Sequence, residues 1–215
     1  MAKSNKPNIQ EVAVPTQSEP SDKKARRLTV LVHALALLAV AAVVWWFLRG
    51  CLDAQFTGWD DPGYVNDNTL VKDLSWEGIK NIFSKPVMGN YHPLTILSYA
   101  LDYGAAGLEP LRYHAHNLLL HLLGCGMVYW LSYLLSGRWV AGLAAALLFG
   151  IHPMHVESVA WISGRKDVLY GVYYFAACVA YVYYLRGAAA KRWLLYAGVL
   201  LLFIAALLAK PVAVS

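Results

Sequence analysis

The 215-residue chain is 59% hydrophobic and only 14% charged, with a mean hydropathy of +0.45. Charged residues make up about a quarter of an ordinary globular chain, so this composition excludes a typical soluble domain. The net charge of +5 comes without a repeated RNA- or DNA-binding pattern, so nucleic acid is not expected as a partner. The three cysteines form no C-x-x-C pair, which removes the usual signature of a zinc ribbon or a dithiol redox motif.

Residues 1–27 are predicted to form a disordered cytoplasmic tail, because they are polar and show no periodic apolar pattern. Four cations between Lys23 and Arg27 end this tail. The apolar run 28–48 follows and has the length of a membrane-spanning helix, about 20 residues. Since positive clusters favour the inner side of a membrane, the N-terminus is predicted to be cytoplasmic.

Residues 49–112 are then expected to form a large extracytoplasmic loop. Within it, Ser75 is a helix-capping residue before an apolar face that runs to Phe83, which predicts a short amphipathic helix on the membrane surface. A second helix is predicted from Pro93 to Tyr103, with proline in its first turn.

Residues 113–215 contain four further apolar runs, at 113–135, 139–151, 168–185 and 193–209. The second of them is short and stops at His152-Pro153, which predicts an interrupted span followed by a second extracytoplasmic segment, 152–167. Cations at Arg138 and at 186–192 mark the inner ends of these spans. The predicted fold is therefore an all-α, multi-pass bundle in a bacterial inner membrane or an ER-type membrane, surrounded by membrane lipids.

Two adjacent acids, Asp60 and Asp61, lie in the turn-forming stretch G-W-D-D-P-G-Y, within the loop that follows the first span. One interpretation is a catalytic carboxylate pair at the mouth of a membrane cavity. The other is a polar turn that only closes the loop.

Arg165 and Lys166 lie on the predicted outer side, where positive residues are disfavoured, and this placement suggests an anionic ligand. Arginine suits bidentate phosphate contact and lysine offers a point charge. Snorkelling of both side chains to lipid headgroups is the alternative.

The predicted outer side also collects imidazoles and a carboxylate, which together suggest a ligand site; its members are His92, His114, His116, His152, His155 and Glu157. Metal ligation by His152, His155 and Glu157 is one interpretation, but Pro153 breaks the helical spacing that such a site needs. Hydrogen bonding to sugar hydroxyls or phosphate is favoured. His114, Asn117 and His121 share one helix face, where they either face a ligand or hydrogen-bond to neighbouring helices.

Four motifs occur in order: G-W-D-D-P-G-Y-V-N, N-Y-H-P-L-T-I-L-S-Y-A-L-D, Y-H-A-H-N-L-L-L-H and I-H-P-M-H-V-E-S-V-A-W-I-S-G-R-K-D-V-L. With them, the chain from about Phe56 onward resembles the membrane part of the transmembrane and tetratricopeptide-repeat O-mannosyltransferase family and its bacterial relatives. That family belongs to the GT-C glycosyltransferases, which use lipid-phosphate sugar donors on the extracytoplasmic face.

The resemblance implies a concrete division of roles. Asp60 would be the general base and Asp61 its support, while Arg165, Lys166 and His152 or His155 would stabilise the donor phosphate. The implied partners are a polyprenyl- or dolichyl-phosphate sugar, such as a mannose donor, and an acceptor protein or glycan. No cofactor is expected. The tetratricopeptide repeats and later spans of the family are not found in this chain, so its activity alone is left open.

Three other classes remain as alternatives. A proton-transporting subunit needs ionisable residues through the bilayer, and only His33 and His121 lie deep in predicted spans. A membrane zinc hydrolase would use the histidines as ligands. A non-catalytic anchor for a repeat array would need none of these side chains.

Overall fold

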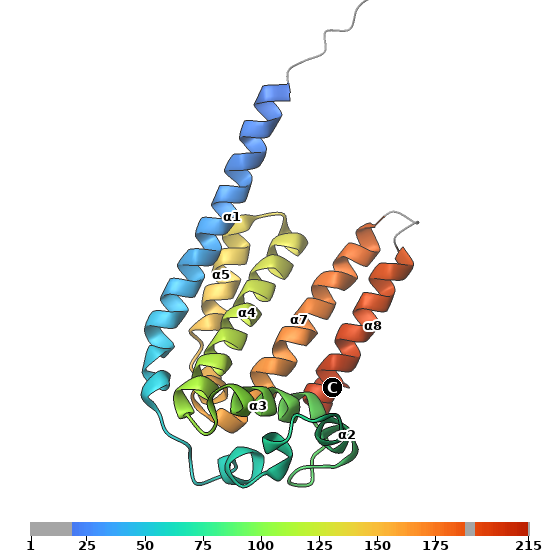
Figure 1. Cartoon of the computed structure of the whole chain (residues 1–215). Coiled ribbons are helices and arrows are strands. Elements are labelled where there is room, and N and C mark those ends of the chain that lie inside the picture. The colour runs from blue at the N-terminus through green and yellow to red at the C-terminus, as the bar shows by residue number, and fades with distance from the viewer. Residues whose placement is uncertain (1–18, 188–191, 215) are drawn as a thin grey trace, which may run out of the picture.

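A computed structural model describes residues 19–187 and 192–214. The described chain is helical, and Figure 1 shows its long helices side by side with one end of the bundle covered by shorter helices. The long helices are α1 (Glu19–Leu48), α4 (Pro110–Ser136), α5 (Trp139–Gly150), α7 (Arg165–Arg186) and α8 (Arg192–Ala209). The short ones at the covered end are α2 (Trp76–Ser84), α3 (Pro93–Ala106) and α6 (Met154–Ala160).

The predicted membrane character of the bundle is confirmed. Within residues 19–187 and 192–214, four helices are long and apolar enough to cross a membrane, and a fifth span results if α5 and α6, which meet at a 66° bend, are counted as one. The bend lies in the break between Gly150 and Met154, which contains His152-Pro153, and the sequence predicted an interruption there because proline cannot continue a helical hydrogen-bond ladder. The chain is thus an all-α, multi-pass membrane protein.

The first helix differs from its predicted start. It begins at Glu19 rather than at Leu28, so residues that the sequence placed in a disordered tail continue the helix. Residues 1–18 of the predicted tail lie outside the described residues. In Figure 1, the N-terminal part of α1 extends well beyond the other helices.

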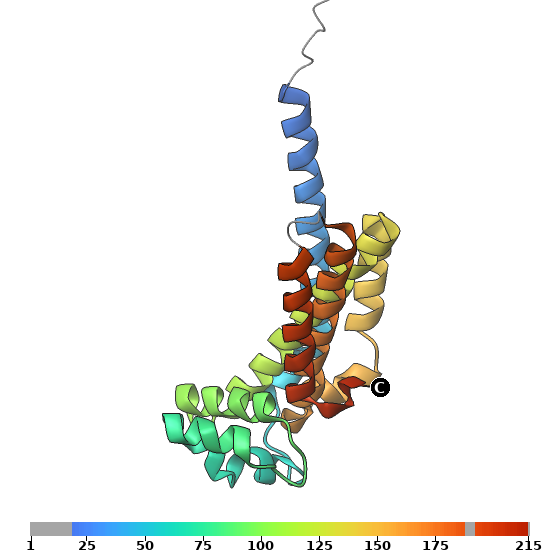
Figure 2. The ribbon, with the colours of Figure 1, turned by 90° about the vertical axis from the view of Figure 1, so that its right-hand side faces the viewer.

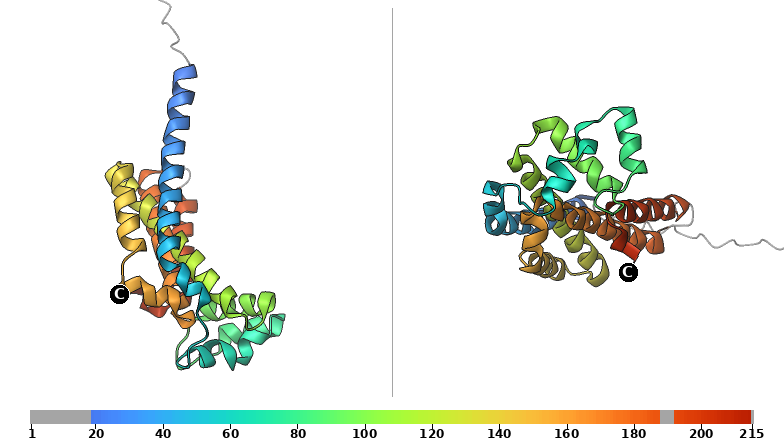
Figure 3. Two further views of the ribbon diagram at one scale, coloured as in Figure 1. Left: turned by 90° about the vertical axis from the view of Figure 1, so that its left-hand side faces the viewer. Right: turned by 90° about the horizontal axis from the view of Figure 1, so that it is seen from below.

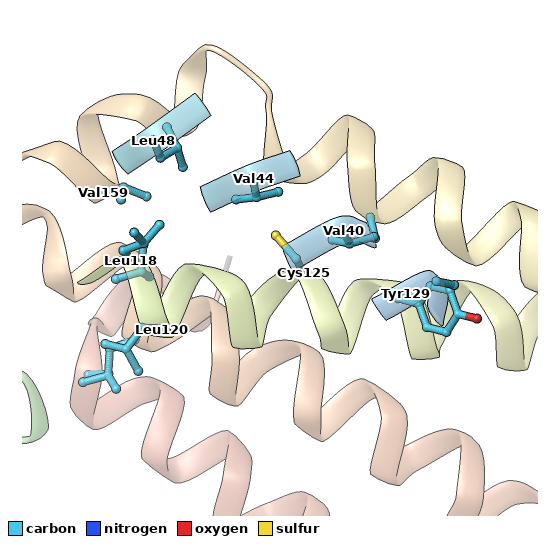
Figure 4. Packing of buried hydrophobic residues seen from close by; sticks show 13 residues of the cluster. Val40, Val44, Leu48, Leu118, Leu120, Cys125, Tyr129 and Val159 are labelled. Atoms are coloured by element: carbon cyan, nitrogen blue, oxygen red, sulfur yellow. The ribbon is translucent and has the colours of Figure 1, made fainter. Parts of the chain in front are cut away.

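One side of the bundle core joins α1 to α4 and α5. Figure 4 shows Val40, Val44 and Leu48 of α1 facing Leu118 and Cys125 of α4. Close approach of α4 and α5 needs Gly142, since a Cβ at that position would come within 2.8 Å of the Tyr129 carbonyl oxygen. This packing fixes α1, α4 and α5 relative to one another, and the longer segments that connect the spans lie at one end of these helices.

The segment between α1 and α4 forms a cap at that end. Ser75 accepts a hydrogen bond from the Gly78 amide at 3.1 Å, which confirms the predicted N-cap of α2. Helix α3 begins at Pro93 as expected, but it lies across the ends of the spans, as Figures 1 and 2 show. Figure 3, seen from below, shows the cap and the α6 segment on different sides of the same bundle end.

Candidate functional site

Asp61 is the buried member of the acid pair. One carboxylate oxygen accepts hydrogen bonds from the Thr57 amide at 2.7 Å and the Thr57 hydroxyl at 2.9 Å. The other oxygen accepts from the Ser163 amide at 3.0 Å and from the Ser163 hydroxyl. Because both oxygens are used and the side chain is fully buried, Asp61 joins the cap to the turn before α7.

Asp60 is the accessible member. Its side chain is 35% exposed, and one carboxylate oxygen lies 3.6 Å from the Lys166 ammonium. A proline follows the pair, and the single π-helical turn η2 (Pro62–Asn66) turns the chain away after Asp61. Asp60 thus keeps part of its carboxylate exposed beside a cation.

Lys166 is held over aromatic faces. Its ammonium lies 4.9 Å from the centroid of the Tyr64 ring and 5.3 Å from that of the Trp161 ring. Cation–π contacts of this kind orient an ammonium without removing it from water, and the side chain stays 19% exposed. Lys166 is therefore the cation of the predicted pair that can meet a ligand.

The sequence suggested that Arg165 binds a phosphate, but in the fold its partners are groups of the protein. Its guanidinium is fully buried and donates to the side chains of Asp102 and Asn117, the latter at 2.7 Å. It also donates to the backbone carbonyl oxygens of Ser98 at 3.3 Å and Tyr113 at 2.8 Å. With its fork filled by protein acceptors and no exposed surface, Arg165 is not placed to bind a donor phosphate. This assignment is corrected.

Asp102 is the centre of this buried cluster. It also accepts from Arg112 Nε at 3.1 Å and lies 3.0 Å from His116 Nδ1. Burial opposes the charge of Asp102, but His116 and Arg165 together outweigh it and hold the pKa of Asp102 below its usual range. The cluster thus connects α3, α4 and α7. Because Lys166 directly follows Arg165 in the chain, the cluster also helps to fix Lys166 next to Asp60.

His92 is buried beside the acid–lysine contact. Its ring lies 5.2 Å from that of Tyr64, and its Nε2 has no hydrogen-bond partner among the described residues. Burial, followed by the charges of Lys166 and Lys210, lowers the pKa of His92 to about 4. A buried imidazole with an unpartnered nitrogen therefore lies within electrostatic range of two cations.

Lys210 was missed by the sequence analysis. It lies at the end of α8 and pairs with Asp167, the residue after Lys166. A lysine that ends an apolar run beside a proline is a recognisable signal of a span end, but its partner in α7 is visible only in the fold. Lys210 adds a second cation near His92.

The remaining predicted residues fall into two groups. His114, His116 and Asn117 belong to α4: His114 is buried within electrostatic range of Asp61, His116 pairs with Asp102, and Asn117 donates to the Trp161 carbonyl at 3.0 Å. Asn117 thus joins helices, one of the two roles considered for this face. Within the described chain, no hydrogen bond or ion pair joins these three residues to Asp60 or Lys166.

The α5–α6 junction carries the others. His152 is exposed and its Nδ1 accepts from the Met154 amide at 3.2 Å. His155 packs on Phe149, with ring centroids 4.4 Å apart. His155 also lines a cavity of about 300 Å³ between α4, α5 and α7, to which Asp167 contributes a carboxylate. Glu157 lies on the exposed side of α6. Over residues 19–187 and 192–214, no three His, Cys, Asp or Glu side chains are placed to hold a metal ion together.

The chain is similar in sequence to protein O-mannosyl-transferases. It is 36% identical to Tmtc1 of Drosophila melanogaster over 127 residues, which are 59% of this chain and 14% of that protein. It is 34% identical to TMTC2 of Homo sapiens and 38% identical to tmtc2 of Xenopus laevis, in each case over 154 residues, 66% of this chain and 18% of the relative. The chain thus spans less than a fifth of the length of these curated relatives. No family model and no solved structure matches it. These matches confirm the resemblance that the motifs indicated: by sequence, the chain is a relative of the transmembrane and tetratricopeptide-repeat O-mannosyltransferases.

Proposed function

We propose that this chain forms part of a membrane glycosyltransferase of the GT-C type. It would transfer a sugar, mannose by analogy with the names of its relatives, from a polyprenyl- or dolichyl-phosphate donor to an acceptor hydroxyl. The reaction would take place on the extracytoplasmic face, which the distribution of cations along the sequence supports. The single observation that carries the proposal is an accessible Asp60 held beside Lys166 by a buried Asp61.

The geometry suits a displacement at the anomeric carbon. Asp60 would accept the proton of the acceptor hydroxyl as its oxygen forms a bond to that carbon. The bond between the carbon and the phosphate oxygen breaks, and the lipid phosphate leaves with the electron pair. Attack opposite the leaving group inverts the anomeric configuration. Asp61, fully occupied by Thr57 and Ser163, would keep the base in position.

The phosphate that leaves gains negative charge, and fixed cations stabilise such charge. We assign this role to Lys166 and Lys210, with the unused Nε2 of His92 as an additional contact. His155 remains a donor-side candidate because its cavity includes Asp167, the partner of Lys210. His152 is retained with it, as its exposed ring lies 5.9 Å from that of His155.

A transfer assay tests the proposal. Membranes carrying the full-length protein would be incubated with radiolabelled polyprenyl-phosphate mannose and, separately, with a radiolabelled nucleotide sugar. Label should reach acceptor protein from the lipid-linked donor only. Transfer from the nucleotide sugar would reject the donor class, and no transfer from either would favour a non-catalytic anchor.

A further inference from the structure

An open groove of about 550 Å³ lies next to the acid pair. Its walls come from the segment before Asp60 and from the end of α6, and its lining residues are Thr57, Trp59, Glu157, Ala160 and Trp161. The Trp161 indole N–H donates to the Thr57 hydroxyl at 3.0 Å, so the two walls are joined. The groove is therefore a defined feature of the fold.

The groove adjoins the proposed reaction centre through each wall. Thr57 also donates to Asp61, and the Trp161 ring that lines the groove lies under the Lys166 ammonium. Trp59 directly precedes Asp60 in the chain. A molecule in this groove would thus lie beside the carboxylate that we propose as base.

The groove offers aromatic surface and negative charge. The Trp59 side chain is 80% exposed, and its ring meets that of Trp161 edge-on at 6.1 Å. Glu157 is exposed, and no cation forms an ion pair with it in the described part of the chain. An indole face beside a carboxylate is suited to the side chain of a lysine or arginine, which each group attracts.

We infer that this groove binds the acceptor polypeptide, with a basic side chain near the serine or threonine to be modified. The inference rests on the proposed function, and it assigns Trp59 and Glu157 to acceptor specificity. An anionic lipid surface fits less well, because the Glu157 carboxylate repels negative headgroups. For the same reason, we place Glu157 on the acceptor side rather than beside a donor phosphate, since like charges repel.

Helix α2 supplies matched controls. Trp76 is 72% exposed and is followed by Glu77, which pairs with Lys80, so the same residue types occur together on another part of the cap. Trp59→Ala should raise the acceptor KM about tenfold and leave the donor KM within twofold. Trp76→Ala should change neither. The unchanged protein should prefer Ser peptides with a neighbouring lysine over Ser peptides with a neighbouring glutamate. Glu157→Lys should reverse this preference, and Glu77→Lys should not.

A binding experiment separates this inference from the function itself. A Lys-containing Ser peptide with a photoreactive group would be crosslinked to the full-length protein in membranes and the adducts mapped. Adducts within 57–59 or 157–161, lost in Trp59→Ala, support the groove even if no transfer is seen. Transfer with an unchanged acceptor KM in Trp59→Ala, or adducts elsewhere only, would overturn it. Equal losses in Trp59→Ala and Trp76→Ala would indicate membrane contact instead and also overturn it.

Discussion

Replacing Arg165 with methionine leaves an unbranched, shorter side chain that fills only part of the same space, and it removes the charge. Asp102 would lose its fully buried partner, and the carbonyl oxygens of Ser98 and Tyr113 would lose their donors. Breaking a buried ion pair by removing one member costs about 3–5 kcal/mol. For a chain of this size each kcal/mol shifts the melting temperature by about 2–4 °C, so we expect a decrease of about 6–20 °C.

Arg112 is the matched control, because it donates to the same carboxylate but is 52% exposed. A pair with one exposed member is worth at most about 1 kcal/mol, so Arg112→Met should lower the melting temperature by no more than about 4 °C. Unfolding in detergent can be followed with a thiol-reactive dye. Cys125 is free and buried, and would react only when α4 separates from its neighbours.

A double variant keeps the test informative if Arg165→Met does not fold. Combining it with Asp102→Leu removes both buried charges, and part of the loss should be recovered because no uncompensated carboxylate remains. A melting temperature for Arg165→Met equal to that of Arg112→Met would refute the assignment of Arg165 to the structure rather than to the ligand.

Two further predictions concern the cations and His92. Lys166→Ala should raise the donor KM about tenfold, whereas Lys80→Ala, on exposed α2, should leave it unchanged; equal donor KM values would remove Lys166 from the phosphate site. The pKa of His92 is about 4 in the fold and 6.5 for an ordinary histidine, so the unfolded chain binds more protons between these values. The contribution of neutral His92 is therefore complete above pH 6.5 and is lost as the pH falls towards 4, by about 3 kcal/mol in total. His92→Gln should flatten the dependence of unfolding free energy on pH in this window, and an unchanged slope would contradict the burial of His92.

Hydropathy was sufficient to predict the spans, because a helix in a bilayer must be long and apolar whatever it packs against. The bend after α5 could be predicted because proline acts locally. The orientation of α3 across the bundle end could not, since it depends on contacts such as that of the Thr95 hydroxyl with the Ala209 carbonyl, 114 positions away.

The same limit applies to the site. Asp60 and Lys166 could be placed at one end of the bundle from their positions beside apolar runs. The sequence could not predict which of the two adjacent cations faces the ligand. Arg165 and Lys166 are neighbours at the start of α7, and only the directions of their side chains differ. The partner of Arg165 is Asp102, 63 positions earlier, and no local pattern connects them. The different environments of Asp60 and Asp61 likewise could not be predicted, because they depend on the hydrogen bonds that Ser163 donates to Asp61.

The most direct test of the account compares Asp60→Asn with Asp67→Asn in the full-length protein. Asp67 is an exposed acid of the same cap and lies just after η2, so its replacement controls for loss of a surface charge. We expect Asp60→Asn to lower the rate of transfer from polyprenyl-phosphate mannose by at least about a hundredfold, the lower range for loss of a general base, with donor binding within twofold of normal. Asp67→Asn should transfer at the normal rate. Transfer by Asp60→Asn at the rate of Asp67→Asn would contradict the assignment of Asp60 as the base.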